Sequence, residues 1–163
     1  MSLFVVESDV DMLSLLQEVY TAHTAEAIPD GSGSSHFGGP EGWIHGLEMV
    51  RLAPRWWNVG LIGKAVDELR CARQVGATRQ MIVNRLRPFG KLEPHRDGWP
   101  DRLRFHLPLQ TSPGAYWWDE QNGDVHMACG TWYGPVPYCG VLHAAYNPTP
   151  VDRVHLVVDF ERR

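Results

Sequence analysis

From residue 78 onward, polar and apolar residues alternate along the chain, and this alternation restricts the fold more than any other feature of the sequence. Successive side chains of a strand point to opposite faces of a sheet, so a period of two predicts strands. Glycines, prolines and the pair Asn122-Gly123 separate six such segments: TRQMIVNRLRP, RLRFHLPLQ, AYWWDE, VHMACGTWY, YCGVLHAAYN and RVHLVVDFE. The Asn-Gly pair predicts a hairpin with a type I′ turn. Many short strands joined in this way predict a β-sandwich or a β-barrel.

The first 75 residues have helical periodicity instead. A helix is expected near residues 9–22, because its apolar residues recur three and four positions apart. These residues are Val10, Leu13, Leu16, Val19 and Tyr20. A second helix is expected near residues 59–73 for the same reason. Residues 28–42 are rich in glycine, serine and proline, and they predict a loop that is either a lid or a plain connector.

The composition is that of an ordinary globular protein. With 163 residues, 44% of them hydrophobic, the chain is expected to form one domain over residues 1–163, with helical support in 1–76 and a β-barrel core in 77–163. The net charge of −4 argues against nucleic acid as a ligand. Three cysteines without a Cys-x-x-Cys pair argue against disulfides and a thiolate zinc site. With neither a secretion signal nor a membrane segment evident, a cytoplasmic location and no membrane partner are expected.

The triplet His95-Arg96-Asp97 is the main candidate for metal chemistry. Residues i and i+2 of an extended segment share a face, so His95 and Asp97 can present a nitrogen and an oxygen to one ion. His143 ends an apolar strand beside small residues and is the best candidate for a third ligand. Two histidines and a carboxylate are typical of non-haem Fe(II) oxygenases, in which the metal keeps positions open for a cosubstrate and dioxygen. The alternative is a surface turn in which Asp97 caps backbone amides.

Arg153 begins the strand RVHLVVDF, ten residues after His143. An inward-pointing guanidinium can hold a carboxylate through two parallel hydrogen bonds, which suits the far end of a dicarboxylate such as 2-oxoglutarate. Alternatively, Arg153 lies at the surface and pairs with Asp152 or Glu161. The face of the strand that carries Arg153 also carries His155, Val157 and Asp159.

Residues 102–109 show the most regular alternation. One face is apolar, and the other carries Arg102, Arg104 and His106. Because this strand begins five residues after Asp97, its polar face is expected near the candidate metal, where two arginines and a histidine would form a pocket for anions. A polar face that is merely solvated is the alternative.

These segments together resemble the aspartyl/asparaginyl β-hydroxylases, a family of Fe(II)- and 2-oxoglutarate-dependent oxygenases that includes bacterial proline hydroxylases. The resemblance rests on LEPHRDG, RLRFHLPL, LHAAYN and DRVHLVVD and on their spacings, and it covers about residues 78–160. It implies a mainly β fold, the double-stranded β-helix or cupin-like jelly-roll barrel, with the N-terminal helices packed on one sheet.

The resemblance also implies roles for individual residues. His95, Asp97 and His143 would bind Fe(II). Arg153 would bind the distal carboxylate of 2-oxoglutarate, His106 would lie near its iron-chelating end, and Asn84 would help to hold it. Arg102 and Arg104 would face the substrate. Asn84 could equally be a buried residue that satisfies backbone groups.

The presence of Asp97 departs from the best-known animal members of the family, which lack the carboxylate ligand, and agrees with the proline hydroxylase branch. The expected function is therefore Fe(II)- and 2-oxoglutarate-dependent hydroxylation, with dioxygen, of a carboxylate-bearing small molecule or peptide, such as a free amino acid or an Asp, Asn or Pro residue. The alternatives are a non-catalytic cupin that binds a small acid or a metal, and an iron enzyme that does not use 2-oxoglutarate.

Overall fold

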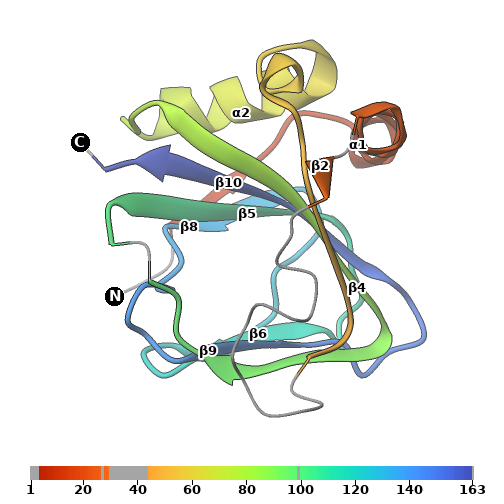
Figure 1. The fold of residues 1–163 in the computed structure, drawn as a ribbon, viewed down its shortest axis with the longest axis vertical. Helices are drawn as coiled ribbons and strands as arrows, with labels where there is room; N and C mark the ends of the chain where they lie inside the picture. Colours follow the sequence, from red (N-terminus) through yellow and green to blue (C-terminus); the bar gives the residue numbers. More distant parts are fainter. Residues whose placement is uncertain (1–3, 27, 30–43, 99, 163) are drawn as a thin grey trace.

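The structure is a computed structural model that describes residues 4–26, 28–29, 44–98 and 100–162 (Figure 1). The elements, in chain order, are β1 (Phe4–Glu7), α1 (Met12–Glu26), β2 (Ile28–Pro29), β3 (Ile44–Arg51), a short 3₁₀ turn η1 (Pro54–Trp56), α2 (Gly60–Ala72), β4 (Thr78–His95), β5 (Arg102–Gln110), β6 (Tyr116–Asp119), β7 (Gly123–Val125), β8 (Thr131–Gly134), β9 (His143–Tyr146) and β10 (Arg153–Glu161).

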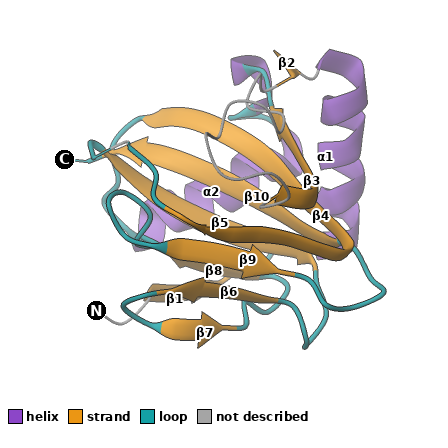
Figure 2. Cartoon of the chain, turned by 60° about the horizontal axis from the view of Figure 1, so that its bottom comes forward, coloured by secondary structure: helices purple, strands orange, loops and turns teal. Residues whose placement is uncertain are grey.

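The strands of the described part form one curled antiparallel sheet. Its order is β1-β8-β5-β10-β4-β9-β6-β7, and β3 also pairs with β4. The long strand β4 pairs with β10 through its first half and with β9 near its end, so it joins the two layers visible in Figure 1. This is the expected mainly β jelly-roll architecture, with α1 and α2 on the outer face of the layer that contains β5 and β10 (Figure 2).

The pairing of strand β4 with β3 is irregular where the sheet curls. The pairing of β3 with β4 passes from Leu86 directly to Lys91, so residues 87–90 form a bulge. Within it, Phe89 has a φ of 60°, a left-handed conformation that is uncommon for a residue with a Cβ atom. A bulge bends a strand locally, which here turns the end of β4 toward β9.

Two apolar clusters stabilise the fold. The larger lies between the helices and the outer face of the sheet and includes Leu15, Leu69, Phe105, Leu156 and Val158. The smaller lies inside the barrel and comprises Leu86, Trp117, Met127, Tyr133, Val136 and Ala145. Alternate residues of β5 and β10 therefore face the helices, and the residues between them face the barrel interior.

A side chain of α1 docks α2 onto the domain. The residue before α2, Val59, offers no side-chain cap. Instead, the Glu18 carboxylate of α1 accepts hydrogen bonds from the backbone N–H groups of Leu61 and Ile62, both at 3.0 Å. A negative charge stabilises the N-terminus of a helix, and here it also joins the two helices.

The helices and strands partly match the sequence prediction. The strand at residues 102–110 and the second helix are found within one residue of their expected limits, whereas α1 begins three residues later and ends four residues later than expected. The predicted apolar stripe of α1 is wrong in one position, because Leu13 is 65% exposed while the neighbouring Leu15 is fully buried. The segment at 125–133 breaks into separate strands, and only residues 143–146 of the segment at 138–147 form a strand.

The sequence predicted helical support in residues 1–76 and the β-barrel core in residues 77–163, but the sheet includes strands from both parts. Strand β1 pairs with β8 and β3 pairs with β4, so the N-terminal part contributes strands as well as helices. The predicted hairpin is confirmed in the pairing of β6 with β7, but its connection is residues 120–122, none of which has a positive φ, and Gly123 already belongs to β7, so the turn is not type I′. The predicted lid or connector at residues 28–42 lies outside the described residues except for β2. None of the described helices is long and apolar enough to cross a membrane.

Candidate functional site

Three side chains predicted to bind metal come together at one end of the barrel. His95 ends β4 and His143 begins β9, and the two residues face each other in the register of these strands. Asp97 follows in a single bridge to Cys139. One ligand atom from each of the three residues lies within 4.8 Å of the other two, and the group could hold a metal ion.

Both histidine rings are oriented by backbone carbonyl groups. The Nδ1 atom of His95 lies 2.9 Å from the carbonyl oxygen of Glu93, and Nδ1 of His143 lies 2.9 Å from that of Val141. A carbonyl oxygen only accepts, so Nδ1 carries the proton in both rings and Nε2 carries the lone pair. The Nε2 atoms of His95 and His143 lie 3.6 and 3.8 Å from the Asp97 carboxylate. This arrangement presents two nitrogens and a carboxylate to one point, as a divalent metal requires.

The environment of His143 keeps its ring neutral. Burial, together with the neighbouring His95, lowers the pKa of His143 to about 4, so the ring is uncharged at pH 7. The indole of Trp117 stacks on it, with ring centroids 4.9 Å apart and planes inclined by 14°. The Trp117 N–H in turn donates to the buried Asp119 carboxylate at 3.0 Å. Trp117 is therefore a core residue that also packs against the candidate metal group.

A second polar group lies deeper in the barrel, around Arg153. The side chains of Arg153, His106 and His155 are at least 95% buried. Among the described residues, Nη2 of Arg153, Nε2 of both histidines and Oδ1 of Asn84 have no hydrogen-bond partner. The surface alternative for Arg153 is excluded, because Asp152 pairs with Arg85 and Glu161 pairs with Arg79. Buried polar groups of this kind call for a polar ligand.

The charge in this deeper group is carried by Arg153 alone. Burial lowers the pKa of Arg153 to about 10, so the guanidinium stays protonated at pH 7. Burial, and then the charges of Arg153 and other neighbours, hold the pKa of His106 and of His155 well below the ordinary value. The two rings are thus neutral, and their Nδ1 atoms lie 3.3 Å apart. A buried guanidinium between neutral donors and acceptors fits a carboxylate of 2-oxoglutarate, and the His-Asp-His group fits Fe(II).

Arg104 does not lie free beside the metal group. Its Nε and Nη2 donate to the two oxygens of Asp159 at 2.8 and 2.9 Å, and its Nη1 donates to Oδ2 of Asp97 at 3.2 Å. Burial alone would lower the pKa of Arg104, but the bond to Asp159 and the two nearby carboxylates raise it overall. In the structure Arg104 contacts the carboxylates of Asp159 and Asp97. Its contact with a substrate stays a prediction.

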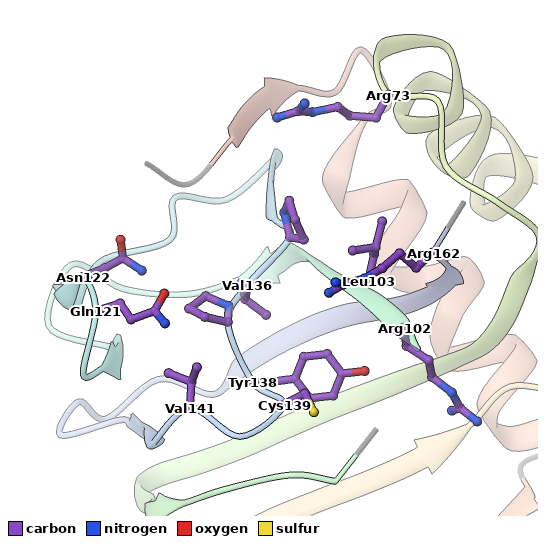
Figure 3. A pocket seen from close by; sticks show the side chains of 12 residues that line it. Arg73, Arg102, Leu103, Gln121, Asn122, Val136, Tyr138, Cys139, Val141 and Arg162 are labelled. Carbon is purple, nitrogen blue, oxygen red and sulfur yellow. The ribbon is translucent and has the colours of Figure 1, made fainter. Parts of the chain in front are cut away.

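Arg102 lines a cavity of about 470 Å³ next to this group (Figure 3). It also lies 3.9 Å from Asp159. Tyr138 forms part of the cavity wall, and its ring lies 4.2 Å from the Arg104 guanidinium carbon. The described residues that line it are Arg73, Arg102, Leu103, Gln121, Asn122, Pro135, Val136, Pro137, Tyr138, Cys139, Val141 and Arg162, and among these are three arginines and no acidic residue.

The structure brings the three metal candidates together and places His106 near Arg153, while Asn84 lies opposite His155 in the register of β4 and β10. It adds three polar residues that the sequence analysis gave no role: Asp159, Gln80 and His155. Asp159 and His155 share the inward face of β10 with Arg153, which was visible in the sequence. Their partners were not, because the contact of Asp159 with Arg104 depends on the register of β10 against β5.

The fold is similar to that of several solved oxygenases. A prolyl-4-hydroxylase from Pseudomonas putida is 17% identical, with a TM-score of 0.68 over 99% of this chain and 92% of that chain. The viral collagen prolyl hydroxylase of Paramecium bursaria Chlorella virus-1, in complex with 2-oxoglutarate, is 13% identical, with a TM-score of 0.65 over 100% and 97%. HygX from Streptomyces hygroscopicus, with nickel and 2-oxoglutarate bound, is 9% identical, with a TM-score of 0.64 over 98% and 82%. Among the curated proteins, none matches the chain.

The chain shares the jelly-roll fold of these oxygenases, and the group of His95, Asp97 and His143 inside it could hold a metal ion. The sequence profile of the family described as aspartyl/asparaginyl beta-hydroxylase matches residues 61–163. The chain belongs to this family, and it is a hydroxylase. The alternative of a non-catalytic cupin is set aside by this membership.

The buried histidine pair predicts a loss of stability in mild acid. Because the pKa of His155 is lowered in the folded state, the unfolded chain takes up a proton below pH ~6.5 while the folded chain does not. The free energy of unfolding of the metal-free protein should therefore fall, by up to about 1.4 kcal/mol per pH unit for each such histidine, as the pH drops below ~6.5. Urea titrations in EDTA would measure this slope, which should be smaller in His155→Gln. Equal slopes in the two proteins would contradict the prediction.

Proposed function

We propose that the chain hydroxylates a carboxylate-bearing small molecule or peptide residue, with His95, Asp97 and His143 as the iron ligands. In this proposal Arg153, His106 and Asn84 hold 2-oxoglutarate, and Arg102 and Arg104 face the substrate. The observation that carries the proposal is that Arg153 and Arg102 lie in two separate places. Arg153 lies buried in the barrel without an anionic partner among the described residues, whereas Arg102 lines the outer cavity.

The orientation of the two histidine rings supports the proposed iron ligands. The carbonyl groups of Glu93 and Val141 fix the proton on Nδ1 of each histidine, so that Nε2 is the ligand atom. When bound together, Fe(II) and 2-oxoglutarate supply the oxidising chemistry, in which dioxygen is used to hydroxylate a C–H bond and 2-oxoglutarate becomes succinate and carbon dioxide.

The cosubstrate residues act through charge and through exclusion of water. The guanidinium of Arg153 would form paired hydrogen bonds with the distal carboxylate, which are strong because the site is buried. His106 packs edge-on against Trp117, with ring centroids 5.3 Å apart, and this contact holds its Nε2 atom within the barrel. Because the His106 ring is neutral, its Nε2 can donate to a carboxylate if the proton resides on that nitrogen.

The charge at the cavity supports the proposed substrate class. Its lining carries three arginines and no acidic residue, which favours an anionic ligand. Arg102 lines this cavity and Arg104 does not, so Arg102 is the arginine better placed to contact a substrate carboxylate. A volume of about 470 Å³ accommodates a free amino acid or the end of a peptide.

Replacement of one iron ligand tests the metal group. Replacing a residue that only orients a metal ligand typically lowers metal affinity about 10–100-fold. Because His143 is itself a proposed ligand, His143→Ala should weaken Mn(II) binding by more than this. Isothermal titration calorimetry with Mn(II) alone would measure this loss. His126→Ala provides a matched control, because His126 also binds a backbone carbonyl through Nδ1, at 2.9 Å, but lies outside the metal group. Unchanged Mn(II) affinity in His143→Ala would overturn the assignment.

Replacement of Arg153 by lysine tests the cosubstrate group. Arg153→Lys keeps a positive charge but loses the planar fork, so the Kd for 2-oxoglutarate should rise about 10–100-fold, as expected for the loss of a charge-assisted hydrogen bond. The titration is made on protein saturated with Mn(II), and the affinity for Mn(II) itself should stay within about twofold. If both affinities fall together, Arg153 serves the fold rather than the cosubstrate.

Mass spectrometry of reaction mixtures tests the substrate class. Free amino acids and peptides containing Asp, Asn or Pro are incubated with Fe(II), ascorbate and 2-oxoglutarate, and a gain of one oxygen atom identifies the substrate. Arg102→Ala should lower kcat/KM for hydroxylation about 10–100-fold, while 2-oxoglutarate is still consumed without hydroxylation. Arg79→Ala, which removes an exposed arginine paired with Glu161, serves as the control. A substrate without an anionic group would refute this part of the proposal.

A further inference from the structure

A fully buried carboxylate, Asp159, lies behind the candidate metal group and takes no part in the functions proposed above. Its Oδ1 accepts from Nε of Arg104 at 2.8 Å, and its Oδ2 accepts from Nη2 of Arg104 at 2.9 Å. Oδ2 also accepts from Nε2 of Gln80 at 2.5 Å. Two parallel bonds to one guanidinium fix both the distance and the plane of the arginine.

The fixed guanidinium has one further nitrogen, and it points to Asp97. With Nε and Nη2 engaged by Asp159, Nη1 donates to Oδ2 of Asp97 at 3.2 Å. The ring of Tyr138, 4.2 Å from the guanidinium carbon, covers the arginine. The direction of Nη1 is therefore set by contacts on β10 and on the loop before β9, not by Asp97 itself.

The backbone of Asp97 is held independently of its side chain. Its N–H donates to the carbonyl of Tyr138 at 3.3 Å, and its carbonyl accepts from the N–H of Gly140 at 3.0 Å. The Arg104 bond to Oδ2 then fixes the side-chain rotation. In this orientation Oδ1 lies 3.6 Å from Nε2 of His95, and Oδ2 lies 3.8 Å from Nε2 of His143.

We infer that Asp159 is a positioning residue for the metal site, which acts through Arg104 on the carboxylate of Asp97. It has two effects on the metal. It orients the Asp97 carboxylate toward the two histidines, and it keeps the charge of Arg104 paired, so that the guanidinium does not compete with a divalent cation for Asp97. This inference rests on the proposed function, in which Asp97 is a metal ligand.

A purely structural role is the competing explanation. The pair of Asp159 and Arg104 joins β10 to β5, and its bond to Gln80 reaches β4, so it could serve only to hold the sheet together. The two explanations differ in one respect. A structural pair stabilises the fold whether or not Asp97 is present, whereas a positioning residue affects metal binding only through Asp97.

The first experiment measures Mn(II) affinity in Asp159→Asn by calorimetry, without 2-oxoglutarate or substrate. We expect the Kd to rise about 10–100-fold, the usual cost of losing a group that orients a metal ligand. Asp152→Asn is the matched control, because Asp152 also accepts two bonds from one arginine, Arg85, at 2.8 and 2.6 Å, but does not contact Asp97. Its Kd should equal that of the unchanged protein.

A second variant avoids leaving a buried charge unpaired. Arg104→Gln combined with Asp159→Asn removes one positive and one negative charge, so the net charge of the site is unchanged and the protein is more apt to fold than Asp159→Asn alone. Its Mn(II) Kd should also rise at least about tenfold. With Co(II) bound, its visible absorption spectrum should differ from that of the unchanged protein, because the orientation of Asp97 has altered.

A double-mutant cycle separates the two explanations. In an Asp97→Ala background, the further change Asp159→Asn should alter the Mn(II) Kd by less than about twofold, because the carboxylate on which it acts is gone. Equal losses in both backgrounds, or no loss in either Asp159→Asn or the charge-balanced variant, would overturn the inference. If His95→Ala and His143→Ala also leave Mn(II) binding intact, the metal site itself is wrong. If those two variants lose binding and the Asp159 variants do not, only the positioning role fails.

Discussion

The pairing of β10 between β4 and β5 is the constraint on which the rest of the structure depends. All residues of β10 except the last are buried. Its outward residues, such as Leu156 and Val158, pack under the helices, and its inward residues are Arg153, His155, Val157 and Asp159. Because both faces are covered, a register shift of one residue would place the polar residues in the apolar core. The register therefore fixes the cosubstrate group and the Arg104 contact at the same time.

Charge balance explains how so many ionisable groups are accommodated inside a small barrel. Asp97 and Asp159 offset Arg104 and Arg153, while His106, His143 and His155 are held neutral by burial. A divalent metal and a dianionic cosubstrate would add charges that cancel each other. The pairing is uneven, however, because both carboxylates contact Arg104 and neither is bonded to Arg153. The unequal distribution leaves a negative group for a cation and a positive group for an anion within one interior.

The sequence predicted the strands with regular alternation well and the irregular segments poorly. Residues 102–110 were predicted correctly, because every second residue is apolar and packs under the helices. Strand β3 was missed, because its stability comes from pairing with β4 and not from a period within IHGLEMVR. Leu13 was wrongly placed on the buried face of α1, because three- and four-residue spacing allows more than one stripe and the sheet chooses between them.

The sequence by itself determined which residues could serve chemistry: a histidine and a carboxylate two residues apart, a distant histidine, and an arginine ten residues after it. Such spacings define which side chains share a face within one strand, because that depends on local backbone geometry alone. Only the tertiary structure decided which faces meet. It placed His95 opposite His143 through the curl of β4, and it showed that the charge of Arg104 is bound by Asp159. The partner of a charged side chain depends on the register between strands far apart in the chain, and no spacing within either strand records that register.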